Sequence, residues 1–322
     1  MENLQEMIAF GPVPSRRLGR SLGVNNIPPK NCTYSCIYCQ VGNIGKIQFE
    51  RRELYRPEII AQEVEKKVKK IMELGESIDY LAFVPDGEPT LDIHLGDEID
   101  LLRPFGVKIG VISNASLIWR EDVRRDLMKA DWVSLKVDAV DKKIWRRINR
   151  PHRDLQLPVI QEGMLQFARE YTGELVTETM LVKNVNDSVD HIKDVANFLS
   201  QLRPTKAYLS IPTRPPAEKR VHPPSEEMLN AAYQILSSRL EDVECLFGYE
   251  GNAFSLTGNV EADLLGIVAV HPMREEAVRE FLTKAGKGWS LVQNLIYRNL
   301  LFETEYEGQK YFMRRLDGKE KE

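Results

Sequence analysis

The stretch NCTYSCIYCQVG, which runs from Asn31 to Gly42, places Cys32, Cys36 and Cys39 at a C-x3-C-x2-C spacing. The chain of 322 residues holds four cysteines, and three of them fall within this one stretch. Thiolates bind soft metals and iron–sulfur clusters, and close spacing lets one loop surround one metal centre. A structural zinc site needs four ligands, but the nearest histidine in sequence is His94. A [4Fe–4S] cluster held by three cysteines leaves one iron without a protein ligand, and we favour this interpretation over a zinc site or buried thiols.

The cysteine spacing, with Tyr38 just before the third cysteine, resembles the radical S-adenosylmethionine (SAM) superfamily. In that superfamily the open iron binds the amino and carboxylate groups of SAM. An electron from the cluster then cleaves SAM to methionine and a 5′-deoxyadenosyl radical, which abstracts hydrogen from a substrate. The resemblance therefore implies an enzyme in which Cys32, Cys36 and Cys39 hold a [4Fe–4S] cluster and Tyr38 lies beside the cofactor SAM. It also implies a partner of the flavodoxin or ferredoxin type that donates electrons.

The segment before the cysteines, from Phe10 to Lys30, is rich in Gly, Pro and Arg. Together with the CQ-x-G end of the cysteine loop, it resembles the branch of the superfamily related to the wyosine tRNA-base synthases. This resemblance favours a base of RNA as the substrate. Two alternatives stay open: radical modification of a peptide or protein side chain, and a non-catalytic iron–sulfur sensor that binds nucleic acid. Arg16, Arg17 and Arg20 of this segment either are solvated or face an anionic substrate.

The composition is typical of a globular protein, with 43% hydrophobic and 29% charged residues. The sequence contains no run of about 18 apolar residues, so it predicts no membrane span. The start, MENLQEMIAF, lacks the basic and apolar regions of a signal peptide. An oxygen-sensitive cluster fits a reducing compartment, so we expect a cytoplasmic protein. The net charge of −4 argues against a protein that coats nucleic acid, but it allows a local basic patch.

Apolar runs alternate with helical patterns along most of the chain. Predicted strands lie at residues 21–25, 80–84, 108–112, 132–137, 174–182 and 206–211. Segments with a 3.6-residue period predict helices at residues 57–74, 159–171, 187–202 and 225–240. A further apolar stretch, residues 243–247, carries the fourth cysteine, Cys245, which we expect to be a buried thiol.

This alternation predicts an α/β fold in which right-handed crossovers connect the strands of a parallel sheet. The pattern alone allows a doubly wound sheet. The resemblance to the radical SAM superfamily favours a partial (β/α)6 TIM-type barrel, which we assign to residues 1–253.

The segment PDGEPTL, Pro85 to Leu91, directly follows the second predicted strand. It resembles the GGE motif of the superfamily, with Asp86 in place of the first glycine. The resemblance implies that Gly87 and Glu88 lie beside the amino group of SAM, because a carboxylate that faces an ammonium makes a strongly oriented hydrogen bond. The alternative for Glu88 is a loop carboxylate or a helix N-cap.

Other candidates lie near the C-terminal ends of predicted strands, where barrel enzymes place their sites. Asn114 follows the third strand and either hydrogen-bonds SAM or substrate, or stabilises the turn itself. Ser134 and Lys136 alternate with apolar residues on the fourth strand, so they share one face. The resemblance implies that this face contacts the carboxylate and ribose of SAM; the alternative is an ordinary polar face. Glu178 on the fifth strand is a minor candidate. Arg214, after the sixth strand, either meets the substrate or belongs to a rigid loop bounded by prolines.

The most basic window of the chain runs from Lys142 to Arg153, KKIWRRINRPHR. Seven of its twelve residues are Lys, Arg or His, and Trp145 lies among them. Such a window either meets the phosphates of a nucleic acid or forms a solvated helix face.

The last part of the chain, residues 254–322, follows a different pattern. It predicts helices at residues 263–270, 274–282 and 290–299, and then a hairpin of residues 301–306 and 309–314. This order resembles a winged helix-turn-helix domain, a fold class that often binds nucleic acid with its third helix. That helix offers only Arg298 as a cation, and ten Lys or Arg face eleven Asp or Glu across the segment. A protein contact or a structural role is therefore an equal alternative.

Overall fold

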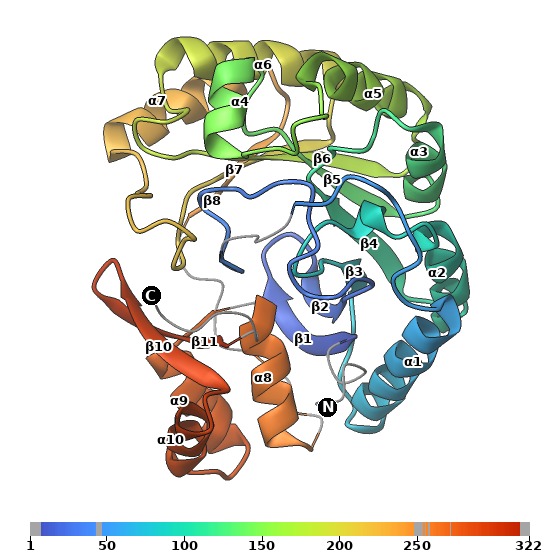
Figure 1. Ribbon diagram of the computed structural model, residues 1–322, viewed down its shortest axis with the longest axis vertical. Coiled ribbons are helices and arrows are strands. Elements are labelled where there is room, and N and C mark those ends of the chain that lie inside the picture. The colour runs from blue at the N-terminus through green and yellow to red at the C-terminus, as the bar shows by residue number, and fades with distance from the viewer. Residues whose placement is uncertain are drawn as a thin grey trace.

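The main element of the structure is a curled sheet of eight strands, which lie side by side in sequence order (Figure 1). The computed structural model describes residues 8–42, 47–247, 254, 256, 258–270 and 272–315. The strands are β1 (Ala9–Ser15), β2 (Gly19–Val24), β3 (Tyr80–Phe83), β4 (Lys108–Ser113), β5 (Trp132–Lys136), β6 (Glu174–Met180), β7 (Lys206–Ser210) and β8 (Val243–Leu246). β1 pairs antiparallel with β2, and each later pair of neighbours is parallel. The predicted α/β fold with a partial TIM-type barrel is confirmed.

Helices connect the parallel strands and form an arc outside the sheet (Figure 1). They are α1 (Pro57–Glu73), α2 (Leu95–Leu102), α3 (Glu121–Leu127), α4 (Lys142–Ile148), α5 (Leu157–Glu170), α6 (Val189–Leu202) and α7 (Glu226–Ser237), with short 3-10 turns η2 (Pro89–Leu91) and η3 (Arg103–Phe105). In α1, Pro57 occupies the first turn, where proline is favoured. Ile60, Val64, Val68 and Ile71 recur at helical spacing and are buried against the sheet.

The six predicted strands correspond to β2 through β7. The sequence analysis does not predict β1, which contains Gly11, Pro12 and Pro14. Proline cannot donate a ladder hydrogen bond and is tolerated mainly at sheet edges and bulges. β1 has both features, because it is the first strand of the sheet and its register with β2 shifts between Phe10 and Val13.

β8 adds one parallel strand beyond the six that the sequence predicts, and it pairs with β7. All of its residues are half-buried, as suits a short strand at the edge of the sheet. The sequence predicts that Cys245 is buried, but its side chain is only half-buried.

Alternation along the strands divides the side chains between the two sides of the sheet. The larger core fills the space between the sheet and the helices and includes Val133 and Leu135 of β5. A smaller apolar cluster lies on the concave side and consists of Leu18, Ala82, Trp132, Val176 and Tyr208. Ser134 and Lys136 share the face of β5 that carries Trp132. These two polar side chains therefore point into the half-barrel.

The C-terminal elements form a second unit beside β1. They are α8 (Val260–Val270), β9 (Met273–Arg274), α9 (Glu275–Lys284), α10 (Ser290–Tyr297), β10 (Leu301–Tyr306) and β11 (Gln309–Arg314). The strands form a small sheet in the order β10–β11–β9. The predicted three helices and hairpin are present, while the winged-helix assignment and the boundary after residue 253 stay predictions. None of the helices in the described ranges is long and apolar enough to cross a membrane.

The C-terminal unit shares its core with β1. Its buried cluster includes Phe281, Leu295 and Phe312 from the unit together with Phe10 and Val13 from β1. The unit is therefore fastened to the edge of the half-barrel through shared apolar burial.

We predict that Phe10→Ala lowers the free energy of unfolding by about 3–5 kcal/mol, the usual effect of truncating a buried phenylalanine. The side chain is 3% exposed and lies in the shared core. Chemical denaturation followed by circular dichroism measures the change. Met72→Ala on α1 is the control, because Met72 is 56% exposed and its loss should cost about 0.5 kcal/mol or less. Equal denaturation midpoints for both variants would contradict a shared core.

Candidate functional site

The cysteine loop, residues 25–42, leaves the C-terminal end of β2 and is held by backbone hydrogen bonds on two sides. On one side, the N–H of Ile37 donates to the carbonyl of Ile148 at the end of α4 (3.0 Å). On the other side, the carbonyl of Asn31 accepts from the N–H of Glu88, in the segment after β3 (2.9 Å). The loop has no regular secondary structure, so these bonds satisfy backbone groups that would otherwise be buried without partners.

The three predicted thiols lie together on this loop and are half-buried. Side-chain amides reach two of the sulfurs. Nδ2 of Asn114 lies 3.5 Å from Sγ of Cys32, and Nδ2 of Asn149 lies 3.4 Å from Sγ of Cys36. The N–H of Cys39 donates to the carbonyl of Cys36 (3.1 Å). This hydrogen bond closes a tight turn between the second and third cysteines. Hydrogen bonds to sulfur are among the features by which proteins tune iron–sulfur centres.

The donor set of this loop fits an iron–sulfur cluster. Burial raises the pKa of all three thiols, that of Cys36 to about 12. These thiols therefore ionise only when a bound metal supplies positive charge that stabilises the thiolates. In the part of the chain that the structure describes, no group of three or more His, Cys, Asp or Glu side chains is arranged to hold a single metal ion.

Gly87 lies where two backbone segments touch. A Cβ at this position would stand 1.8 Å from the carbonyl oxygen of Asn31, one residue before Cys32. Only glycine permits such an approach, which lets the segment after β3 bond directly to the cysteine loop. The N–H of Lys30 adds a second hydrogen bond to this contact, which we call the seam, by donating to the carbonyl of Asp86 (2.7 Å). The structure thus gives the predicted site residue Gly87 a packing role beside the cysteines.

Glu88 is buried and fully engaged by neighbouring groups. Its Oε1 accepts from Oγ1 of Thr90 (2.6 Å) and Oγ of Ser113 (2.7 Å), and its Oε2 accepts from the N–H of Asn114 (2.7 Å). It also caps the short turn η2 through the N–H of Thr90, which is the alternative left open above. Burial raises the pKa of this carboxyl, while the hydrogen bonds oppose the shift. Glu88 therefore ties the end of β3 to the end of β4.

Asp86, by contrast, is buried with no hydrogen-bond partner for either carboxylate oxygen among the described residues. Burial raises its pKa to about 7, against the opposing influence of the Arg314 and Lys30 side chains. The hydrogen bond from the N–H of Lys30 to the carbonyl of Asp86 (2.7 Å) places this residue against the cysteine loop, and its charge also raises the pKa of Cys39. The sequence analysis treats Asp86 only as a departure from the GGE pattern. An unpaired buried carboxylate beside the thiols is the kind of group that a bound cation satisfies.

Lys136 and Glu178 form a buried ion pair inside the half-barrel, with Nζ and Oε1 2.8 Å apart. Arg17 makes a second ion pair with the same carboxylate, and Oγ of Ser210 donates to it (2.9 Å). Burial opposes ionisation of Glu178, but Lys136 and Arg17 outweigh it and lower its pKa to about 2. Nζ of Lys136 also lies 5.1 Å from the ring centroid of Tyr38, which links the pair to the cysteine loop.

Asp138 extends the alternation of Ser134 and Lys136 by one step and joins three parts of the site. It accepts hydrogen bonds from the hydroxyl of Tyr38, from Nδ2 of Asn149 (2.7 Å) and from the N–H of Met180 (2.9 Å). The cysteine loop, the end of α4 and the end of β6 therefore meet at one carboxylate. Tyr38 is placed by this contact.

The remaining predicted residues divide into those that the structure brings to the site and those that it does not. Ser134 is buried, and its hydroxyl has no partner within the described ranges. Arg214 reaches the site, since its Nη1 donates to Oε1 of Gln40 on the cysteine loop (3.2 Å). Arg20 does not, because it pairs with Glu76 beyond α1. Of the three arginines before the cysteines, Arg17 is the one that enters the half-barrel.

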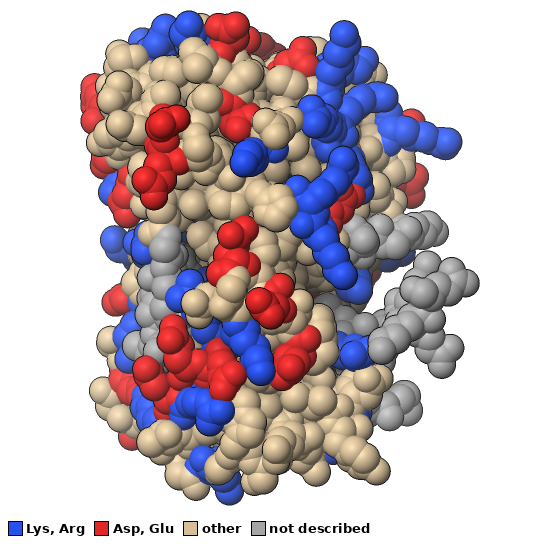
Figure 2. Space-filling view, turned by 90° about the vertical axis from the view of Figure 1, so that its left-hand side faces the viewer, with Lys and Arg blue, Asp and Glu red and all other residues tan. Residues whose placement is uncertain are grey.

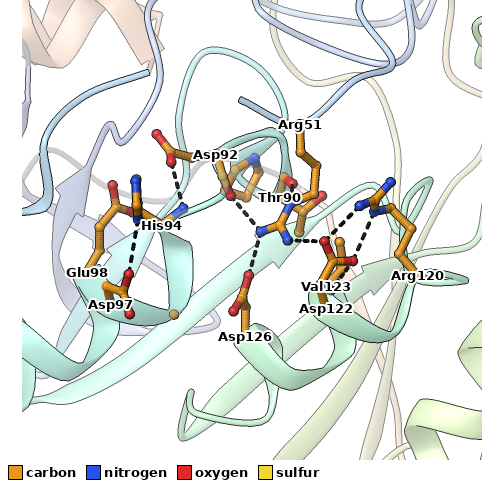
Figure 3. A network of polar contacts seen from close by, with 12 residues as sticks. Arg51, Thr90, Asp92, His94, Asp97, Glu98, Arg120, Asp122, Val123 and Asp126 are labelled. Carbon is orange, nitrogen blue, oxygen red and sulfur yellow. Dashed lines mark hydrogen bonds and ion pairs between the residues drawn. The ribbon is translucent and has the colours of Figure 1, made fainter. Parts of the chain in front are cut away.

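A polar network that the sequence analysis does not predict supports the segment after Glu88 (Figure 3). Arg51 donates to the carbonyls of Thr90 (2.8 Å) and Asp92 (2.6 Å). Its guanidinium also pairs with Asp122 and Asp126 of α3. The Arg51 side chain is only 4% exposed, so it acts as a buried clamp between this segment and α3. No local signal in the sequence identifies it, since its partners are 39 to 75 residues away.

Residues 26–199 match the family model of the radical SAM superfamily, and this range contains the three thiols and every predicted cofactor residue. The chain belongs to the radical SAM superfamily, whose members use a [4Fe–4S] cluster and SAM. It is 48% identical over 316 residues to a UPF0026 protein of Methanocaldococcus jannaschii, with 98% of each chain covered. It is also 23% identical over 205 residues to a probable dual-specificity RNA methyltransferase RlmN of Protochlamydia amoebophila, covering 62% of this chain and 54% of that protein.

Solved structures show the same fold at low sequence identity. A radical SAM methyltransferase from Sphaerobacter thermophilus matches with a TM-score of 0.53 and 16% identity, covering 70% of this chain and 66% of that one. A structure of TYW1 with a lysine-pyruvate adduct bound matches with a TM-score of 0.50 and 17% identity, covering 69% and 74%. The half-barrel is therefore the radical SAM fold, with TYW1 among its structural neighbours.

We predict that Gly87→Ala destabilises the seam beside the cysteines, because the added Cβ would overlap the carbonyl of Asn31. The expected cost is about 1–3 kcal/mol in the free energy of unfolding, and less iron should bind after anaerobic reconstitution. Denaturation curves and iron analysis measure the two effects. The control is Gly288→Ala, where the nearest side chain to an added Cβ is 3.7 Å away. Full iron binding and unchanged stability in Gly87→Ala would show that the close approach is dispensable.

Proposed function

We propose that this protein is a radical SAM enzyme that holds a [4Fe–4S] cluster on Cys32, Cys36 and Cys39 and acts on a base of RNA. The observation that carries the proposal is the thiol loop with its amide donors, placed beside the unpaired carboxylate of Asp86. When both are bound, the cluster and SAM supply the 5′-deoxyadenosyl radical that takes a hydrogen atom from the substrate. A reduced protein of the flavodoxin or ferredoxin type would supply the electron.

The residues around the thiols fit the two ends of the SAM methionine moiety. The buried carboxylate of Asp86 has no partner among the described residues, so it suits the ammonium group of SAM. Lys136 pairs with Glu178, but its ammonium group has three donors, so it can also donate to the carboxylate of SAM. The unpaired hydroxyl of Ser134 lies on the same inner face of β5. Tyr38, Gly87, Glu88 and Asn114 hold the loop segments that surround this space.

The RNA part of the proposal rests on α4, which joins a basic surface to the cysteine loop. The inner side of α4 carries Trp145, whose Nε1 donates to the hydroxyl of Tyr34 (3.2 Å), with the two rings edge to face. The outer side carries Lys142, Lys143, Arg146 and Arg147, which are exposed and form no ion pair with other described residues. In Figure 2, Lys and Arg gather over one side of the upper, barrel half of the molecule. Such a surface attracts the phosphates of RNA.

The related RlmN protein named above is an RNA methyltransferase, which supports the same substrate class. In this chain α4 is joined to the cysteine loop, because Asn149 at the end of α4 contacts both Cys36 and Asp138. RNA that binds α4 would therefore be held next to the thiols.

We predict that Cys36→Ala abolishes reductive cleavage of SAM while the protein stays folded, because the lost ligand lies on a loop. The wild-type protein, reconstituted anaerobically and reduced with dithionite, should release 5′-deoxyadenosine from SAM, as measured by mass spectrometry. Cys245→Ala is the matched control, since this half-buried thiol lies on β8 away from the loop. A protein that carries zinc, or that releases no 5′-deoxyadenosine as wild type, would contradict the proposed enzyme.

We predict that the double variant Arg146→Glu and Arg147→Glu weakens tRNA retention by at least about tenfold and lowers the dependence of binding on salt. Gel shifts at several salt concentrations measure both quantities. The control is Lys66→Glu with Lys69→Glu, which makes the same charge change on the exposed side of α1. Unchanged tRNA retention in the α4 variant, or none in the wild type, would count against RNA and favour a peptide substrate.

A further inference from the structure

A cavity of about 320 Å³ separates the cysteine loop from the C-terminal hairpin. It has the size of a small-molecule site, for which about 300–1,000 Å³ is typical. Three parts of the chain line it: Lys30 and Gln40 from the cysteine loop, Pro215 and Pro216 from the segment after β7, and Phe302 and Arg315 from the C-terminal unit. The cavity therefore lies against the end of the cysteine loop, where Gln40 follows Cys39, although much of its wall comes from the other end of the chain.

The hairpin is fixed in this position by two buried tyrosines. The hydroxyl of Tyr306 donates to the carbonyl of Pro212 (3.2 Å), and that of Tyr311 donates to the carbonyl of Thr213 (2.9 Å). Both acceptors follow β7, at the end of the sheet where the site residues gather. The hairpin thus rests on the rim of the half-barrel and forms part of the site wall.

Strand alternation explains which side chains the hairpin presents to the cavity. Phe302 pairs across the hairpin with Met313, and both line the cavity together with Thr304. The alternate residues Leu301 and Phe312 lie in the core of the C-terminal unit. The face turned to the cavity therefore combines an aromatic ring, a thioether and a hydroxyl.

The charged groups around the cavity are mostly cations. Lys30, Arg314 and Arg315 line it, and none of its described lining residues is acidic. Asp86 lies behind this wall, close enough to Lys30 and Arg314 for each to affect its pKa. The guanidinium of Arg315 lies 5.5 Å from the ring centroid of Phe302, and its Nε has no hydrogen-bond partner among the described atoms. This arrangement offers a ring for stacking and adjacent cations for an anion.

We propose that this cavity binds the substrate as a nucleoside phosphate, with the base against Phe302 and Met313 and the phosphate near Arg314, Arg315 and Lys30. The inference rests on the proposed function and names the part of the chain that recognises the reacting unit. The same chemistry is present in a free nucleotide and in a nucleotide of an RNA chain. The C-terminal unit is then a wall of the active site. Its third helix, α10, contains no Lys or Arg, and Arg298 directly after it pairs with Glu261 (2.7 Å).

The test measures binding to the reconstituted full-length protein, with AMP, GMP, CMP, UMP, inorganic phosphate and tRNA as separate probes. Phe302→Ala and Arg315→Ala should each weaken nucleotide or tRNA binding by about tenfold, since stacking and a charge-assisted hydrogen bond are lost. Phe302→Tyr should restore binding, because it keeps the ring. Lys310→Ala removes the same charge from the exposed part of this hairpin and should change binding less than about twofold.

The probes distinguish the two sources of the ligand. If binding of the mononucleotides depends on Phe302 and Arg315, the ligand is a free nucleotide. If only the binding of tRNA depends on these residues, the ligand is a nucleotide of RNA. Equal binding of all probes by Phe302→Ala, Arg315→Ala and wild type would overturn the inference, as would binding of phosphate alone. Release of 5′-deoxyadenosine is followed in parallel. Its absence in the wild type would overturn the proposed enzyme, whereas its presence without hairpin-dependent binding would overturn only this site.

Discussion

The site depends on the close backbone contact between the cysteine loop and the segment after β3. Gly87 allows the carbonyl of Asn31 to approach, and the N–H of Glu88 then bonds to that carbonyl (2.9 Å). A loop of irregular backbone can hold three thiols in place only if its own polar groups are satisfied. Here β3, β4 and α4 provide the partners. The positions of the sulfurs are therefore set by the rigid half-barrel, although the loop itself contains no helix or strand.

Around this contact, three buried carboxylates are paired, while two buried polar groups of the same region are not. Glu88, Glu178 and Asp138 each accept several hydrogen bonds or ion pairs. Asp86 and Ser134 are buried without partners in the described part of the chain. Leaving a buried polar group unpaired costs about 1–3 kcal/mol. Two such groups on the inner side of one half-barrel, beside a thiol loop, are what a site built for a polar ligand requires.

The sequence predicts the repetitive parts of the molecule and the local chemistry of the loop. β2 through β7 follow from hydrophobic runs, and the cysteines, Gly87 and Glu88 follow from motif spacing. β1 is not predicted because Pro12 and Pro14 suit only an edge strand. Arg17 and Arg51 cannot be assigned from local sequence, since Arg17 lies 161 residues from Glu178, the carboxylate that it meets. Contacts of this kind depend on the curvature of the sheet, and that curvature cannot be predicted from a short stretch of sequence.

The same limitation explains why the contacts between the C-terminal unit and the half-barrel cannot be predicted from the sequence. The half-barrel is open on one side, and the C-terminal unit lies across that opening (Figure 1). It is fastened at one end by the core shared with Phe10 and Val13 of β1, and at the other by Tyr306 and Tyr311 on the segment after β7. A unit held at both ends of an open sheet has little freedom to move as an independent module. Because its hairpin lines a cavity together with the end of the cysteine loop, the hairpin is placed to shape what enters that cavity.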